Sequence, residues 1–95
     1  MFMAVYRFEG ESAALSAAYD RMLKSFPVGQ IVLHTCVVVP GGIEVYDACP
    51  SQAEFERFST SAEFAGALSA AGLPMPTIRP LGEVHNTIVQ GKRLQ

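Results

Sequence analysis

Two apolar, strand-like runs joined by Gly41-Gly42 constrain the fold of this chain more than any other feature. Residues 30–39 are rich in Val and Ile, which favours a β-strand, and residues 43–49 follow directly after the glycines. A Gly-Gly pair suits the primed turns of tight hairpins, because both residues adopt positive φ without strain. The sequence therefore predicts an antiparallel hairpin.

The segment before this hairpin changes from strand to helix periodicity. Residues 2–8 alternate in hydrophobicity with the period of a half-buried strand. From Ser12 onward the apolar residues recur with helical spacing, so we expect a helix that Ser12 caps and that ends before Pro27.

Helical segments and a last strand follow the hairpin. Ser51 and Glu54 have the spacing of a capping box, and residues 61–71 form a second helical piece that Gly72 ends. Prolines then predict an extended link, and residues 83–89 the last strand. The resulting order of strand, helix, strand, strand, helix, strand is that of a ferredoxin-like α+β fold with a four-stranded antiparallel sheet.

The apolar content of the chain predicts a homodimer. Ninety-five residues form one domain, yet 49% of them are hydrophobic and only 17% are charged. The strand at residues 30–39 is apolar on both faces, whereas short helices cover one face of a sheet. We therefore expect the other face to pack against a second copy of the chain.

Charge and hydropathy argue against several classes of protein. The net charge is −2 and the basic residues do not cluster, so nucleic-acid binding is not expected. No segment approaches the roughly 20 apolar residues of a membrane span, and the first residues do not form a signal peptide. A cytoplasmic protein with reduced thiols at Cys36 and Cys49 is expected.

His34 and Asp47 are the candidate catalytic pair, and their geometry depends on the hairpin register. With Gly41-Gly42 as the loop, Cys36 faces Asp47 and His34 faces Cys49, which places His34 and Asp47 diagonally on one face of the sheet. A three-residue loop that includes the preceding proline instead moves Asp47 to the other face from His34. In the first register Asp47 would orient His34 as a general base.

The remaining polar candidates are less specific. Cys49 beside His34 allows a Cys–His nucleophile, although a strand cysteine more commonly acts as a small apolar side chain. His85 and Asn86 are neighbours on the expected last strand, so they would face opposite sides and only one could line a pocket. Neither histidines nor cysteines have the close spacing of a zinc site, so no metal is expected.

Aromatic side chains have the spacing of a core and would also form walls of any pocket between the sheet and the helices. The residues expected to contact a small hydrophobic ligand are Tyr19, Cys36, Cys49, Phe55, Phe58, Phe64 and His85.

The chain resembles the dimeric α/β-barrel superfamily, which includes monooxygenases of antibiotic biosynthesis. The resemblance rests on residues 32–34, on Asp47 and the Ser-x-x-Glu-Phe pattern at residues 51–55, and on residues 70–74 and 84–86. It implies a dimer with a pocket between sheet and helices. The superfamily contains cofactor-free monooxygenases of aromatic polyketides, haem-degrading enzymes and lactone isomerases. Similar sequences carry a Trp after the Asp, whereas this chain reads Asp47-Ala48 and contains no Trp.

Two hypotheses follow. One is a small cofactor-independent enzyme, similar to a monooxygenase, isomerase or cyclase, that acts on an aromatic or carbonyl-bearing metabolite with His34 as base and Asp47 as its orienting carboxylate. Haem held by His34 or His85 is the alternative that the resemblance allows. The other hypothesis is a non-catalytic homodimer that binds a small ligand or a protein partner.

Overall fold

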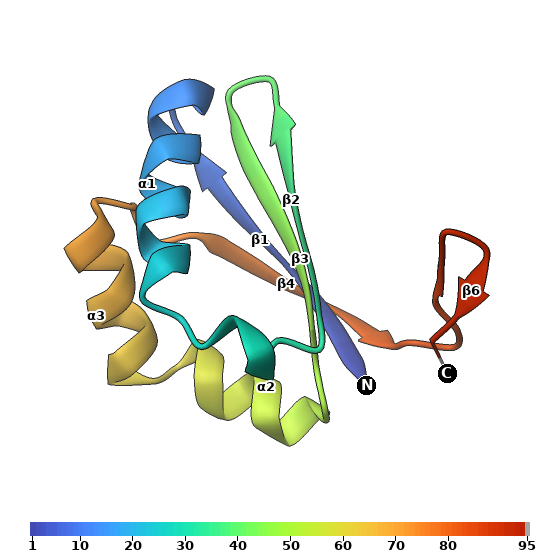
Figure 1. Cartoon of the computed structure of the whole chain (residues 1–95). Helices are drawn as coiled ribbons and strands as arrows, with labels where there is room; N and C mark the ends of the chain where they lie inside the picture. Colours follow the sequence, from blue (N-terminus) through green and yellow to red (C-terminus); the bar gives the residue numbers. More distant parts are fainter. Residues whose placement is uncertain (95) are drawn as a thin grey trace.

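The computed structural model describes residues 1–94, apart from the side chain of Val28. It is an α+β structure in which three helices lie on one face of a four-stranded antiparallel sheet (Figure 1). The strands are β1 (Phe2–Glu9), β2 (Leu33–Val39), β3 (Gly42–Cys49) and β4 (Thr77–Glu83), in the spatial order β2-β3-β1-β4. This order is compatible with a ferredoxin-like arrangement, as the sequence predicts.

The helices are α1 (Ser12–Lys24), α2 (Gln52–Ser59) and α3 (Ala62–Ala71), and a short 3-10 turn, η1 (Val28–Gln30), precedes β2. The expected caps at Ser51 and Gly72 are confirmed, and Ser61 caps α3. The core fills the space between the helices and the inner face of the sheet, where Phe8, Ile43 and Leu68 are almost completely buried.

Ser12 has a different role from the expected N-cap. Glu11 caps α1 instead, because its carboxylate accepts the Ala13 N–H at 2.6 Å. The Ser12 hydroxyl lies 2.8 Å from the carbonyl oxygen of Val39 and 3.0 Å from that of Gly42, and shares its hydrogen between them. The first residue of α1 therefore ties the helix to both strands of the hairpin.

Both expected hairpin registers are wrong. The loop is Pro40-Gly41, Val39 pairs with Gly42, and His34 lies directly opposite Asp47. Pro40 followed by Gly41 at φ +76° is the combination that a type II turn favours. Gly42 is required for another reason, because a Cβ there would overlap the carbonyl oxygen of Phe8 on β1.

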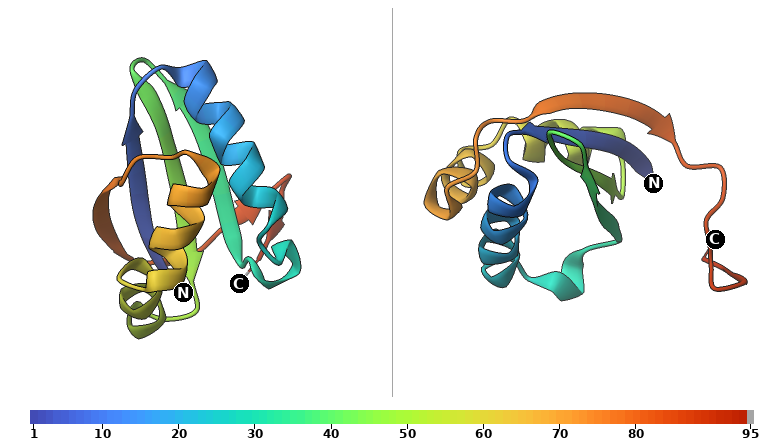
Figure 2. Two further views of the ribbon diagram at one scale, coloured as in Figure 1. Left: turned by 90° about the vertical axis from the view of Figure 1, so that its left-hand side faces the viewer. Right: turned by 90° about the horizontal axis from the view of Figure 1, so that it is seen from above.

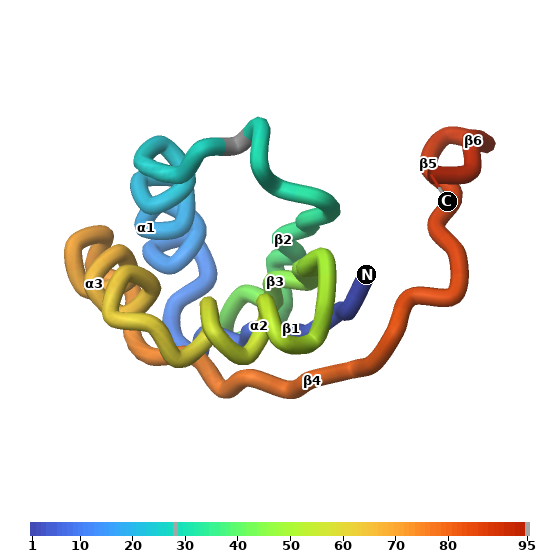
Figure 3. The backbone as a smooth tube through the Cα atoms, turned by 90° about the horizontal axis from the view of Figure 1, so that it is seen from below, coloured from blue at the N-terminus to red at the C-terminus, as the bar shows by residue number. Residues whose placement is uncertain are grey.

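The expected last strand at residues 83–89 is also wrong. The fourth strand of the sheet is β4, which contains Pro80 and pairs with β1 at the edge of the sheet. An edge strand tolerates proline, because a residue there can lack an N–H without breaking the pairing of the sheet. The pairing of β4 with β1 is also irregular at this point, since the register shifts at Leu81, next to Pro80. Residues 84–94 leave the sheet and form a small hairpin of β5 (Ile88–Val89) and β6 (Lys92–Arg93), set apart from the body of the molecule (Figure 3).

None of the helices described in residues 1–94 covers the second face of the sheet (Figure 2). This open face is formed by alternate strand residues that point away from the helices: Met3, Val5, Arg7, Leu33, Thr35, Val37, Glu44, Tyr46 and Arg79. Val37, on the edge strand β2, is 40% exposed, and Leu81, on the opposite edge strand β4, is 43% exposed. Arg7 and Glu44 form an ion pair of 2.9 Å on the same face.

Candidate functional site

A His–Asp pair occupies the inner face of the sheet. Nδ1 of His34 lies 2.8 Å from Oδ1 of Asp47, and the two side chains are 18% and 19% exposed. The hairpin register places the residues directly opposite each other, where Cβ atoms are about 4.5–5.5 Å apart and short side chains can meet. The strand pairing itself therefore holds the pair together.

Tyr19 extends this pair to a chain of three residues. Its hydroxyl oxygen lies 2.7 Å from Nε2 of His34, and the two rings are nearly parallel, with centroids 5.8 Å apart. Tyr19 belongs to the buried stripe of α1, so the helix delivers the phenol to the strand. Burial, followed by the charges of nearby acidic groups, raises the pKa of Tyr19 to about 12 and keeps the hydroxyl protonated at neutral pH.

These contacts fix the tautomer of the neutral imidazole. An ionised carboxylate only accepts hydrogen bonds, so Nδ1 of His34 must carry the proton and donate it to Asp47. Nε2 is then an acceptor, and the Tyr19 hydroxyl donates to it. If the ring becomes an imidazolium, Nε2–H donates to the same hydroxyl, so His34 can gain a charge without losing a partner.

Cys49 contacts the far side of the same carboxylate. Its thiol donates to Oδ2 of Asp47 over 3.6 Å, and burial together with the Asp47 charge raises the pKa of Cys49 to about 11. Cys49 pairs with Phe2 of β1 and does not lie opposite His34 as expected. These surroundings favour the neutral thiol and disfavour a thiolate nucleophile.

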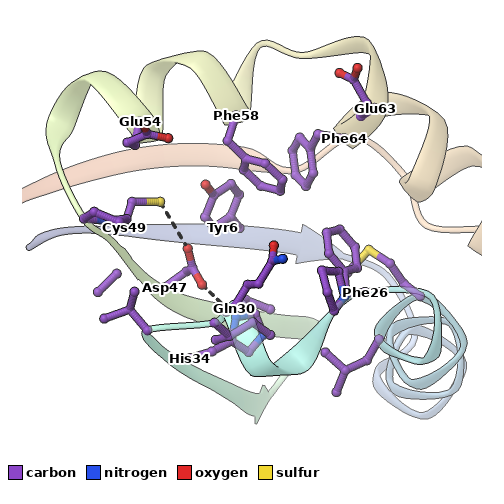
Figure 4. A pocket seen from close by; sticks show the side chains of 18 of the residues that line it. Tyr6, Phe26, Gln30, His34, Asp47, Cys49, Glu54, Phe58, Glu63 and Phe64 are labelled. Atoms are coloured by element: carbon purple, nitrogen blue, oxygen red, sulfur yellow. Dashed lines mark hydrogen bonds and ion pairs between the residues drawn. The ribbon is translucent and has the colours of Figure 1, made fainter.

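A pocket of about 650 Å³ lies over the His34–Asp47 pair, between the sheet and the helices (Figure 4). Its walls are mainly apolar, with Phe26, Phe58 and Phe64 on one side. His34, Asp47 and Cys49 line it from the strands, as Figure 4 shows for the labelled side chains. A volume of this size is in the range of small-molecule sites.

The structure brings together only part of the ligand-contacting set expected from sequence. Cys49, Phe58 and Phe64 line the pocket. Tyr19 lies behind His34, and Cys36, opposite Val45, packs against the core. Phe55 is buried, with its ring 5.4 Å from that of Phe2.

His85 and Asn86 do not reach this pocket. Both are exposed in the segment after β4, because the last strand of the sheet ends at Glu83. Asn86 lines a smaller hollow of about 360 Å³, which Met3 and Leu33 of the open face also line.

Sequence reasoning did not assign four polar residues to the pocket wall: Tyr6, Gln30, Glu54 and Glu63. Tyr6 lines the pocket from β1, and Gln30 lines it from η1. Strand alternation places Tyr6 on the inner face but does not distinguish a pocket wall from a filled core. The sequence predicts a strand from Gln30 onward, and no sequence pattern indicates the 3-10 turn that contains it.

No protein-family model, curated protein or solved structure matches this chain. Within residues 1–94, no three His, Cys, Asp or Glu side chains are grouped so that they could hold a metal ion. None of the described helices has both the length and the apolar character needed to cross a membrane.

The raised pKa of Cys49 predicts that its thiol reacts slowly with alkylating reagents. In a Cys36→Ser background, we expect iodoacetamide to alkylate folded Cys49 about 10²-fold more slowly at about pH 8 than it alkylates the unfolded chain, because the thiolate fraction is small. The rate should increase with pH until the pH passes about 11. Alkylation at the unfolded rate near neutral pH would contradict this assignment and restore the nucleophile hypothesis.

Proposed function

We propose that the protein is a small cofactor-independent enzyme that removes a proton from a hydrophobic aromatic or carbonyl-bearing metabolite. The observation that carries this proposal is the hydrogen-bonded chain of Tyr19, His34 and Asp47 at the wall of an otherwise apolar pocket. The three side chains form hydrogen bonds with one another, and two of them, His34 and Asp47, also line the pocket.

Among these three hydrogen-bonded residues, Asp47 accepts the substrate proton and His34 holds its carboxylate in place. The sequence-based hypothesis made His34 the base, but its Nε2 atom already binds the Tyr19 hydroxyl. Among the residues that the structure describes, Oδ2 of Asp47 has only the long contact with the Cys49 thiol, so it offers lone pairs toward the pocket. The substrate proton moves to this oxygen, and the Nδ1–H of His34 holds the carboxylate in place.

The apolar walls support this chemistry. Apolar walls exclude water from a bound substrate, so the transferred proton passes to the carboxylate and not to solvent. The aromatic rings of Phe26, Phe58 and Phe64 would hold a flat substrate of about two rings. The strand order β2-β3-β1-β4 is also the order that the resemblance to dimeric α/β-barrel proteins implies.

A nitrobenzisoxazole tests the base without knowledge of the natural substrate, because its ring opens when a base removes one carbon-bound proton. We expect the protein to accelerate this reaction over buffer, and Asp47→Asn to lower kcat/KM about 10²-fold. His34→Leu should also lower it, since the carboxylate loses its hydrogen-bond donor. Thr35→Ala, next to His34 but on the open face, is the matched control and should have no effect. If the protein binds the probe but does not accelerate ring opening, the proposed enzymatic function is wrong.

The alternative is a non-catalytic homodimer that binds a small ligand or a partner, and the open face favours the dimer in either case. Val37 on β2 and Leu81 on β4 are exposed on the two edge strands of the sheet. None of the described helices covers the open face (Figure 2). Exposed apolar side chains on a continuous strand surface are typical of subunit interfaces. A twofold partner on this face would leave the pocket on the inner face accessible in both subunits.

Dimerisation predicts a mass of twice 10.2 kDa in sedimentation or light scattering at micromolar protein. Val37→Lys should shift the protein toward the monomer, because it places a charge in the proposed interface. Val38→Lys is the matched control, since Val38 is 64% exposed on the same strand but alternates to the helix side. A monomer at all concentrations, or an equal effect of both substitutions, would contradict the proposed interface.

A further inference from the structure

The hydroxyl of Tyr6 is the one buried side-chain polar atom of residues 1–94 that has no hydrogen-bond partner. Tyr6 is only 4% exposed, on the inner face of β1. Buried polar groups are nearly always paired, because an unpaired group loses its hydration without compensation. An exception next to a pocket indicates a partner that binds there.

The ring of Tyr6 is held in place by its neighbours. Phe55 and Phe64 pack edge-on against it, with centroids 6.4 Å and 5.6 Å away, both at an interplanar angle of 68°. These contacts restrict rotation of the ring. The hydroxyl is therefore directed to one place, the end of the pocket near Cys49 (Figure 4).

The surroundings make this hydroxyl a hydrogen-bond donor. Burial, followed by the charges of Asp47 and Cys49, raises the pKa of Tyr6 above its ordinary value, so the O–H stays protonated. Tyr6 is opposite Val45, which makes it a diagonal neighbour of Asp47 across the β1–β3 pair. A donor and an acceptor thus lie at the same end of the pocket.

The charges around the pocket determine which ligand oxygen can bind. Asp47, Glu54 and Glu63 line it, and none of the lining residues that the structure describes is a lysine or an arginine. A carboxylate or phenolate ligand would be repelled there, whereas an uncharged carbonyl would not. The three aromatic rings Phe26, Phe58 and Phe64 would then contact the ligand body.

We propose that the Tyr6 hydroxyl donates a hydrogen bond to the carbonyl oxygen of an uncharged two-ring ketone, which names the substrate class of the proposed function and rests on it. When Asp47 takes a proton from the carbon next to the carbonyl, the electron pair of that C–H bond forms a C=C bond to the carbonyl carbon. The π pair of the C=O bond moves to the oxygen, which gives an enolate and a protonated Asp47. The bond from Tyr6 strengthens as the negative charge develops on this oxygen.

The test compares tetralone, a two-ring ketone, with the hydrocarbon tetralin of the same shape. In the wild type we expect tetralone to bind more tightly, and the infrared carbonyl stretch of the bound ketone to shift to lower wavenumber. Tyr6→Phe should weaken tetralone binding about tenfold, the loss of one hydrogen bond, and leave tetralin binding unchanged. The bound carbonyl stretch should return to its value in an apolar solvent.

Protein stability provides a second readout. Because the Tyr6 hydroxyl has no partner among the described residues, Tyr6→Phe should have a melting temperature equal to or above that of the wild type. Tyr46→Phe is the matched control, because the Tyr46 hydroxyl donates to Glu44 on the open face. It should leave the affinities for both probes unchanged.

Three results would overturn this inference: equal wild-type affinity for tetralone and tetralin, no binding of either, or a carbonyl stretch that Tyr6→Phe does not change. Hydrogen–deuterium exchange of the tetralone protons separates this failure from that of the proposed function. Exchange that depends on Asp47 but not on Tyr6 would reject the inference and retain the enzyme. A Tyr6-dependent carbonyl shift without exchange would retain the binding site and reject the enzyme.

Discussion

The hydrogen bond between His34 and Asp47 crosses from β2 to β3, and its existence depends on the register of the hairpin. Pro40 and Gly41 alone make the turn, while Gly42 remains in the strand because β1 passes too close to it for a side chain. A shift of one residue would place the two partners on opposite faces of the sheet. The hydrogen bond between His34 and Asp47 in the pocket therefore depends on the close packing of the β1 backbone against Gly42.

The general architecture could be predicted from sequence because periodicity and caps act locally. Strand alternation, the helical stripe from residue 12 and the caps at Ser51 and Gly72 each depend on a few neighbouring residues. The hairpin register could not be predicted, since either glycine can occupy a turn and the close approach of Phe8 is a long-range contact. The last strand was misplaced because Pro80 is unfavourable in a central strand, and only the sheet order shows that β4 is at an edge.

The types of residue at the candidate site could be predicted from the sequence, but the hydrogen bonds between them could not. Histidine and aspartate on paired strands indicated a polar pair, although the predicted diagonal contact is a direct one. The hydrogen bond from Tyr19 was missed, because helical spacing gives the buried stripe but not the residue that a helix places over a given strand. The unpaired hydroxyl of Tyr6 likewise depends on the space left between the sheet and α2 and α3, which no local pattern encodes.

The protonation of the His34 ring tests this account most directly. Nitrogen-15 NMR of imidazole-labelled protein, recorded at a pH where the ring is neutral, distinguishes the nitrogen that carries the proton from the one that does not. The account predicts a proton on Nδ1, donated to Asp47, and an unprotonated Nε2 that accepts from Tyr19. A proton on Nε2, or rapid averaging between the two nitrogens, would contradict it, because neither state is compatible with a chain that runs from the phenol through the imidazole to the carboxylate.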